Sequence, residues 1–197
     1  HQDGYSVPFC DPENPTTSPL EISGEDASPF CFDLDGDGKP DCLVGTKTEG
    51  IKLFMYNTSD ESATLLVEVK GTDNPFSSFD IQGAAPACYD FDGDGKTDCI
   101  IGDADGFFHY LKNTGNTTYA VGLPPVVHKY PQFSKIPETD AKNPFKGYDA
   151  VAGASPFCYD VDGDGDIDCL FGTAVGKIAY YQNTGLPTAP RFQEAKI

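Results

Sequence analysis

The sequence predicts an all-β protein built from three copies of one module. Three strings carry the repetition: SPFCFDLDGDGKPDCLVG at 28–45, APACYDFDGDGKTDCIIG at 85–102 and SPFCYDVDGDGDIDCLFG at 155–172. Around them, short β-branched and aromatic runs alternate with Gly, Pro, Asn and Asp, which is typical of antiparallel strands. The 197 residues contain no helical period of useful length. Because a fixed internal repeat decides architecture, we expect the three modules to fold alike.

The similarity extends beyond these strings and sets the module boundaries. An Asn-Pro dipeptide precedes each string, at Asn14, Asn74 and Asn143, and an aromatic run followed by Asn-Thr comes after it. The predicted units are an N-terminal extension at 1–13 and modules at 14–73, 74–142 and 143–197. Together the modules form one continuous repeat domain.

Each module is expected to contain four short strands. In the first module the strands are, in chain order, Pro29–Phe32, Cys42–Gly45, Ile51–Tyr56 and Leu65–Val69. The first strand enters an Asp-rich loop, the second leaves it, and the fourth has equivalents at 126–130 and 191–195. Four antiparallel strands repeated at this interval describe a propeller blade. We therefore predict three four-stranded antiparallel propeller-type blades in a partial or open β-propeller.

The Asp-rich loops have the spacing of a Ca²⁺ site. In the first loop, aspartates stand at positions 1, 3, 5 and 9, and Lys39 at position 7 can offer only its backbone carbonyl. Carboxylates on alternate residues of a tight loop point at one centre, and the glycines between them let the chain curl. A set of hard oxygen ligands suits Ca²⁺, whereas Zn²⁺ prefers nitrogen and sulfur. The predicted ligands of three Ca²⁺ ions are Asp33, Asp35, Asp37, Lys39, Asp41, Asp90, Asp92, Asp94, Lys96, Asp98, Asp160, Asp162, Asp164, Asp166 and Asp168.

These loops differ from an EF-hand at position 12, where Val44, Ile101 or Phe171 replaces the bidentate Glu. A single Asp-Gly cluster is usually a solvated turn. Three copies with the same spacing and four mutually repelling carboxylates each favour calcium instead. No general base or nucleophile accompanies the loops in the sequence, so we expect the ions to be structural and the protein not to be an enzyme.

Six of the seven cysteines flank the loops in pairs: Cys31 with Cys42, Cys88 with Cys99, and Cys158 with Cys169. Each pair is expected to lie across the two strands of a hairpin, where a disulfide would hold the loop closed. A thiolate metal site is the alternative, but this spacing fits no zinc motif. Disulfides imply an oxidising compartment and extracellular calcium suits weak loop sites, so the protein is expected to be secreted. Cys10 is left over, as either a buried thiol or one half of an intermolecular bond.

The net charge of −18, from 31 acidic and 13 basic residues, excludes several classes of partner. It repels phosphate backbones and anionic membrane surfaces, so we expect no nucleic-acid partner and no membrane insertion. No apolar stretch approaches the ~20 residues needed to span a bilayer. The three histidines, His1, His109 and His128, form no catalytic or metal-binding motif, and His109 is expected to be a packed residue.

Two further sets of residues concern carbohydrate. Sequons at Asn57 and Asn116 are expected to carry glycans in the loops that follow the third strands. Phe54, Tyr110 and Tyr180 are assigned to equivalent positions of the third strand. A recurring aromatic residue there is either part of the core or a surface on which sugar rings stack.

The loops resemble the FG-GAP/VCBS-type repeats of integrin α-subunit propellers, fungal lectins and secreted microbial proteins. The family hallmark resembles D-x-D-G-D-G-x-x-D-[LI]-x-V-G, which corresponds to residues 33–45, 90–102 and 160–172. The resemblance implies a calcium-stabilised propeller with the aspartates as ligands. This chain places Cys where the family usually has apolar residues, and its three blades are too few to close a ring.

The expected function is that of a secreted calcium-binding structural or adhesive repeat protein. The segment Tyr5–Cys10 has no blade of its own and reads as a single strand in need of a partner edge. It could add to a sheet of an adjacent copy and build a head-to-tail filament, or fold back on its own third blade. A calcium-dependent lectin is the alternative function, and a polysaccharide-active enzyme a more remote one.

Overall fold

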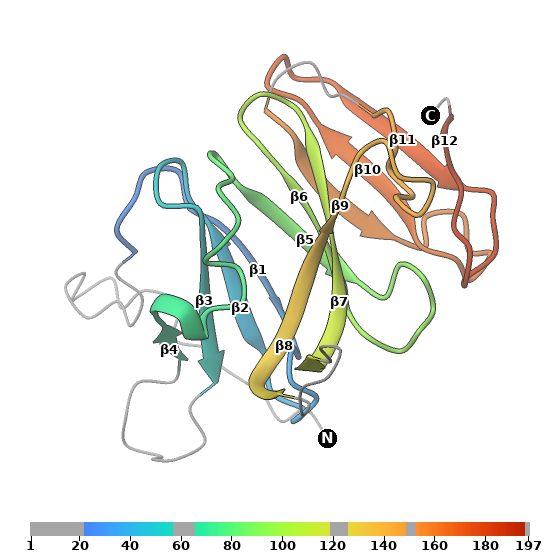
Figure 1. Cartoon of the computed structure of the whole chain (residues 1–197). Helices are drawn as coiled ribbons and strands as arrows, with labels where there is room; N and C mark the ends of the chain where they lie inside the picture. The colour runs from blue at the N-terminus through green and yellow to red at the C-terminus, as the bar shows by residue number, and fades with distance from the viewer. Residues whose placement is uncertain (1–21, 57–65, 119–125, 149–152, 196–197) are drawn as a thin grey trace, which may run out of the picture.

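The computed structural model describes residues 22–56, 66–118, 126–148 and 153–195, and it confirms the all-β prediction (Figure 1). The strands form three four-stranded antiparallel sheets, and a single 3-10 turn, Gly71–Asp73, is the helical structure of the described residues. The first sheet contains β1 (Ser28–Phe32), β2 (Asp41–Gly45), β3 (Ile51–Tyr56) and β4 (Leu66–Val69). The second contains β5 (Ala85–Tyr89), β6 (Asp98–Gly102), β7 (Phe108–Thr118) and β8 (Val126–Ile136). The third contains β9 (Ser155–Tyr159), β10 (Asp168–Gly172), β11 (Ile178–Asn183) and β12 (Phe192–Ala195).

The three sheets follow one another in space as they do in the sequence. The first strands of the sheets lie side by side, β1 against β5 and β5 against β9 (Figure 1). One apolar cluster fills the space between the first and second sheets, and a second cluster fills the space between the second and third. The described strands do not close into a barrel, and the propeller arrangement stays a prediction.

Glycines at the end of each second strand allow the next module to come close. A Cβ atom on Gly45 would lie 1.9 Å from the carbonyl oxygen of Ala84, and one on Gly102 would lie 2.1 Å from that of Ala154. Backbone hydrogen bonds join the modules at the same places. They run from the Gly83 amide to the Lys47 carbonyl (3.1 Å) and from the Gly153 amide to the Ala104 carbonyl (3.0 Å).

The Asn-Pro dipeptides place a phenylalanine in each space between sheets. Asn74 Oδ1 accepts a hydrogen bond from the amide of Phe76, and Asn143 Oδ1 accepts one from the amide of Phe145, both at 2.9 Å. The two phenylalanine side chains are 0% and 1% exposed. The first dipeptide, at Asn14, lies outside the described residues and is followed by Thr16 instead of Phe.

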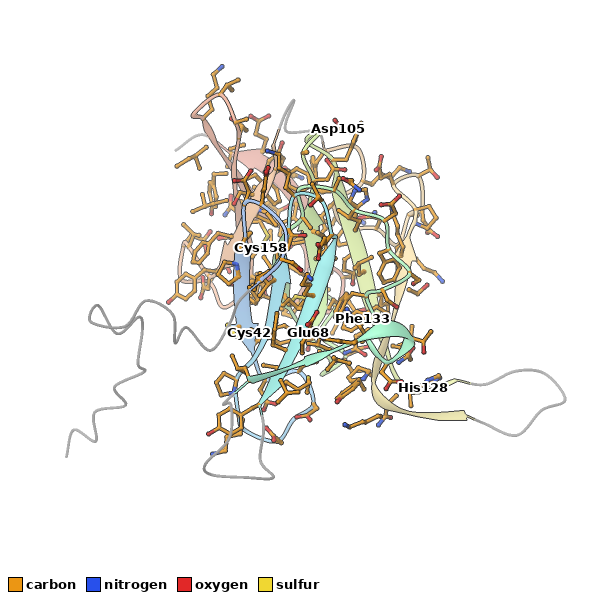
Figure 2. The ribbon with its side chains drawn as sticks, turned by 90° about the vertical axis from the view of Figure 1, so that its left-hand side faces the viewer. Cys42, Glu68, Asp105, His128, Phe133 and Cys158 are labelled. Carbon is orange, nitrogen blue, oxygen red and sulfur yellow. A yellow bond between two sulfur atoms is a disulfide. The ribbon has the colours of Figure 1, made fainter. Side chains whose placement is uncertain are left out.

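The second sheet departs from the sequence prediction because its outer hairpin is long. Strands β7 and β8 have 11 residues each, and the pairing continues past a bulge at Gly115. The fourth strand predicted at 126–130 is present as part of β8. However, Phe133–Ile136 has the register of β4 and β12 in their sheets, so the predicted equivalence of 126–130 with those strands was wrong. In Figure 2, Asp105 in the turn before β7 and His128 on β8 lie at opposite ends of this module.

The predicted equivalence of three aromatic residues was also wrong. Opposite the cysteine of the second strand stand Phe54 in the first sheet, Leu111 in the second and Tyr181 in the third. Tyr110 and Tyr180 correspond instead to Leu53, on the other face of the strand. The error arose because the Asn-Thr dipeptides were aligned with one another, and the first of them comes one residue later in the sequence, relative to the residue that pairs with the cysteine, than the other two.

Candidate metal centres

The structure brings three carboxylates together in each Asp-rich loop. One oxygen atom from each lies within 4.8 Å of the others in the groups Asp33, Asp35, Asp37; Asp90, Asp92, Asp94; and Asp160, Asp162, Asp168. Positions 1, 3 and 5 converge in the first two loops, and positions 1, 3 and 9 converge in the third. The other predicted side-chain ligands, Asp41, Asp98 and Asp164, fall outside these groups. Lys39 and Lys96 at position 7 were predicted to contribute through their backbone carbonyls, and Asp166, the predicted ligand at that position of the third loop, also falls outside the group.

The first aspartate of each loop holds the backbone in a curve. Asp33 accepts hydrogen bonds from the amides of Gly36, Asp37 and Gly38 at 2.8, 3.1 and 2.9 Å. The first aspartates of the other two loops accept the equivalent glycine bond at 2.9 and 3.1 Å. Gly36 and Gly38 both have φ of 81°, a conformation that other residues rarely adopt. The sequence DGDG is therefore required for the curve that turns the carboxylates inward.

The last aspartate of each loop fastens the loop to the third strand. Asp41, Asp98 and Asp168 are 1%, 0% and 0% exposed. Each accepts a hydrogen bond from a backbone amide of the third strand, at 2.8, 2.8 and 2.7 Å. Tyrosine hydroxyls add a second bond in two loops, from Tyr110 to Asp98 at 2.6 Å and from Tyr180 to Asp168 at 2.9 Å. Sequence reasoning missed both tyrosine contacts, because it had assigned these residues a wrong register.

Burial makes the charge on these aspartates costly. It raises the pKa of Asp98 to about 6, although hydrogen bonds from Tyr110 and Asn113 act in the opposite direction. Burial also raises the pKa of Asp41, with hydrogen bonds from two backbone amides again opposing it. A cation bound nearby would favour the ionised form of such carboxylates.

One unsatisfied atom tests whether the loops fit a metal ion. Asp92 Oδ1 is buried and has no hydrogen-bond partner among the described residues. A buried carboxylate oxygen without a partner is energetically unfavourable, and a hard cation would supply the missing contact. The donors are all oxygen atoms, which suits Ca²⁺. The residues present therefore fit calcium.

Three disulfides flank the loops, as the sequence predicted. They join Cys31 to Cys42, Cys88 to Cys99 and Cys158 to Cys169. In each case the two cysteines are direct partners across the hairpin, with Cα atoms 4.1 Å apart. Each bond therefore closes the base of the loop whose two ends the paired strands hold.

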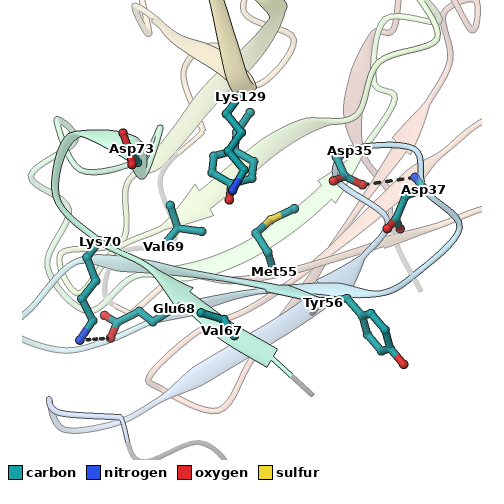
Figure 3. Close-up of a pocket in the computed structure, with 11 residues that line it drawn as sticks. Asp35, Asp37, Met55, Tyr56, Val67, Glu68, Val69, Lys70, Asp73 and Lys129 are labelled. Atoms are coloured by element: carbon teal, nitrogen blue, oxygen red, sulfur yellow. Dashed lines mark hydrogen bonds and ion pairs between the residues drawn. The ribbon is translucent and has the colours of Figure 1, made fainter. Parts of the chain in front are cut away.

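A groove of about 430 Å³ opens beside the first loop (Figure 3). Lys129 from β8 reaches over the groove, Asp35 and Asp37 stand at one end of it, and Lys70 and Asp73 stand at the other end. Met55 from β3 and Val69 from β4 lie between them. Most of the remaining lining is charged or aromatic. The groove thus joins a candidate metal loop to a polar surface formed by two modules.

The remaining predicted residues do not gather at one place. Asn116 is exposed but lies within β7, so its prediction as a loop residue was wrong. Asn57, Cys10 and His1 lie outside the described residues. His109 is 11% exposed at its side chain and lies 2.7 Å from Asp103, as expected for a packed residue. Phe54 and Tyr110 are 5% and 1% exposed and belong to the core.

Repeated four-stranded sheets, each with an Asp-rich loop between its first two strands, define a class of β-repeat protein. Residues 33–101 match the family model of the FG-GAP-like repeat, from the start of the first loop to β6. Residues 33–101 thus resemble an FG-GAP-like repeat, and residues 160–172 repeat the sequence of the same loop beyond the matched region. The comparison with curated proteins gave no match. Among the described residues, no helix has the length and apolar character needed to cross a membrane.

Proposed function

We propose that this FG-GAP-type repeat protein is a secreted, calcium-binding structural or adhesive protein. The observation that carries the proposal is the loop itself, with three convergent carboxylates above a disulfide that ties its two strands. Disulfides of this density suit an oxidising compartment. The carboxylates at positions 1, 3, 5 and 9 would hold the ion, which would neutralise their mutual repulsion. The loops contain carboxylates without an accompanying nucleophile, so the proposed role is structural and not enzymatic.

The third sheet supports the idea that copies assemble. Ile178 is 66% exposed, whereas its equivalents Ile51 and Phe108 are 4% and 3% exposed beneath the following sheet. Phe157 and Tyr159 extend this exposed face along β9, at 56% and 61%. The face therefore keeps the composition of an inter-sheet core and has no described sheet upon it. Exposed apolar surface of this extent marks an interaction site.

We propose that the N-terminal extension of a second copy covers this face. Tyr5, Val7 and Phe9 alternate in that segment and would present one apolar side to the sheet. Their structure lies outside the described residues. Repetition of such a head-to-tail contact, if its rotation does not close, yields an extracellular filament or surface array.

Sedimentation and electron microscopy in calcium buffer test the assembly. Deletion of residues 1–13 and the substitution Ile178→Asp should each leave folded monomers. Val67→Asp is the matched control, because Val67 is also exposed, at 48%, but lies in the first sheet. Filaments that persist in the deletion variant would contradict the proposal, and a wild-type monomer protected from proteolysis at its N-terminus would indicate that the segment folds back.

Calcium-dependent carbohydrate binding is a second candidate, favoured by the groove beside the first loop. Tyr56 lines it together with Asp35 and Asp37, which combines aromatic surface with carboxylates beside a candidate ion. The aromatic residues expected from the sequence do not serve, since Phe54 and Tyr110 are buried. Glycan-array binding that requires calcium and is lost in Tyr56→Ala would support a lectin. Binding that is indifferent to chelator and to this substitution would exclude the groove.

A further inference from the structure

The second loop differs from the other two because a lysine ammonium group lies against it. Lys112 on β7 donates hydrogen bonds from Nζ to Asp92 and to Asp94, the latter at 3.2 Å. Lys96, within the loop, forms a further ion pair with Asp94 at 3.0 Å. Two carboxylates of this candidate metal group thus already have a positive partner, and Lys112 contacts both.

The sheet register identifies the residues that stand at the same place in the other modules. Lys112 follows the residue that pairs with Cys99, so its equivalents are Met55 in the first module and Gln182 in the third. Gln182 approaches its loop in the same way, because its Nε2 donates to Asp162 at 2.6 Å, but it carries no charge. Within the described part of the chain, no lysine or arginine forms an ion pair with an aspartate of the first or third loop.

Resting on the proposed calcium binding, we propose that Lys112 is a built-in counter-ion that makes the second loop the weakest of the three calcium sites. Lys112 occupies Oδ2 of both Asp92 and Asp94, so calcium must either displace the ammonium group from those oxygens or share the two carboxylates with it. An ammonium group that stays nearby also repels the incoming ion. Calcium occupancy is therefore graded along the chain, with the central loop held together in the absence of the ion.

The Lys112 side chain is protonated at physiological pH. Burial lowers the pKa of Lys112, but hydrogen bonds to Asp92 and Asp94 outweigh this and leave the pKa above its usual range. The side chain is 31% exposed, so the ammonium group can swing into solvent when calcium arrives. Lys112 thus modulates the site and does not block it.

Reciprocal substitutions between the second and third loops test this inference. Calorimetric calcium titrations of chelator-stripped protein would compare wild type, Lys112→Gln and Gln182→Lys. Wild type should show two tighter sites and one weaker site. Lys112→Gln should tighten the weaker site by roughly tenfold to a hundredfold, the range that a charge-assisted hydrogen bond supplies. Gln182→Lys should convert a tighter site into a second weak one, while Lys112→Arg should keep the wild-type pattern.

The same variants give a second readout in chelator. Lys112→Gln should lower the thermal unfolding midpoint of the metal-free protein, because Asp92 and Asp94 lose the positive charge of Lys112, and calcium should restore the midpoint. Three sites of unchanged affinity in both Lys112→Gln and Gln182→Lys would overturn the role of Lys112 while leaving calcium binding intact. An absence of calcium binding in every variant would overturn the proposed function as well. Gln182→Lys keeps the test decisive even if Lys112→Gln fails to fold.

Discussion

The last aspartate of each loop has two structural roles: it ends the loop and it binds the third strand of its sheet. These residues are Asp41, Asp98 and Asp168. Each is buried and bonded to a backbone amide of the third strand of its sheet. The spacing of the loop predicts these residues as metal ligands. The sequence does not show whether the carboxylate at position 9 points toward the ion or toward the third strand. Their second role depends on strand register, which a one-residue displacement of an Asn-Thr dipeptide concealed.

The raised pKa of Asp98 predicts a pH effect in metal-free protein. The folded chain, with a pKa of about 6 at this residue, holds the proton more tightly than the unfolded chain, where Asp titrates near 3.9. This residue therefore contributes stability that grows as the pH falls from about 6 to about 4 and that is lost as the pH rises through 6. Thermal unfolding in chelator would measure it as a difference between wild type and Asp98→Asn. Identical pH profiles for the two proteins would contradict the assignment.

Each module is built from hairpins, and junctions between sheets join one module to the next. The disulfide pairs were predictable because they are local: the two cysteines flank a single loop and face each other across one hairpin. The long β7–β8 hairpin was not predictable, because its Asn, Thr and Gly residues are typical of a turn. Pairing across a bulge at Gly115 overrides that preference.

Alanine substitutions at two equivalent glycines, Gly102 and Gly172, separate two effects on stability. One is the steric clash at a junction between sheets, and the other is the replacement of glycine itself. Gly102→Ala places a Cβ atom 2.1 Å from the Ala154 carbonyl oxygen, so the second and third sheets must move apart. Gly172 ends the equivalent strand of the third sheet, and the nearest atoms to its Cβ lie at 3.7 Å. We expect Gly102→Ala to lower the free energy of unfolding by about 3 kcal/mol or more, and Gly172→Ala to change it by less than about 0.5 kcal/mol. Denaturant unfolding measures both, and equal losses would refute a close junction at Gly102.

The net charge of −18 is concentrated at one kind of place in the molecule, the Asp-rich loops. Much of it belongs to the three loops, so three bound Ca²⁺ ions would remove a third of it. The sequence predicted three sheets and three loops because those features repeat within each module. It could not predict that the third sheet exposes Ile178 and Phe157, since their exposure depends on whether a further sheet packs upon them. The proposed assembly and the proposed calcium binding therefore involve separate parts of the molecule, the first the exposed face of the third sheet and the second the three loops.

The dependence of thermal stability on calcium tests the proposed calcium binding most directly, because it measures whether an ion in the loops stabilises the fold. Chelator-stripped protein would be unfolded by heat in millimolar calcium, in equimolar magnesium and in chelator, with its disulfides intact. Each site filled at a hundredfold excess over its dissociation constant adds about 2.7 kcal/mol. We expect calcium to raise the unfolding midpoint by at least about 5 °C and magnesium to raise it by much less. An unfolding midpoint that is the same in calcium and in chelator would contradict the proposed calcium binding.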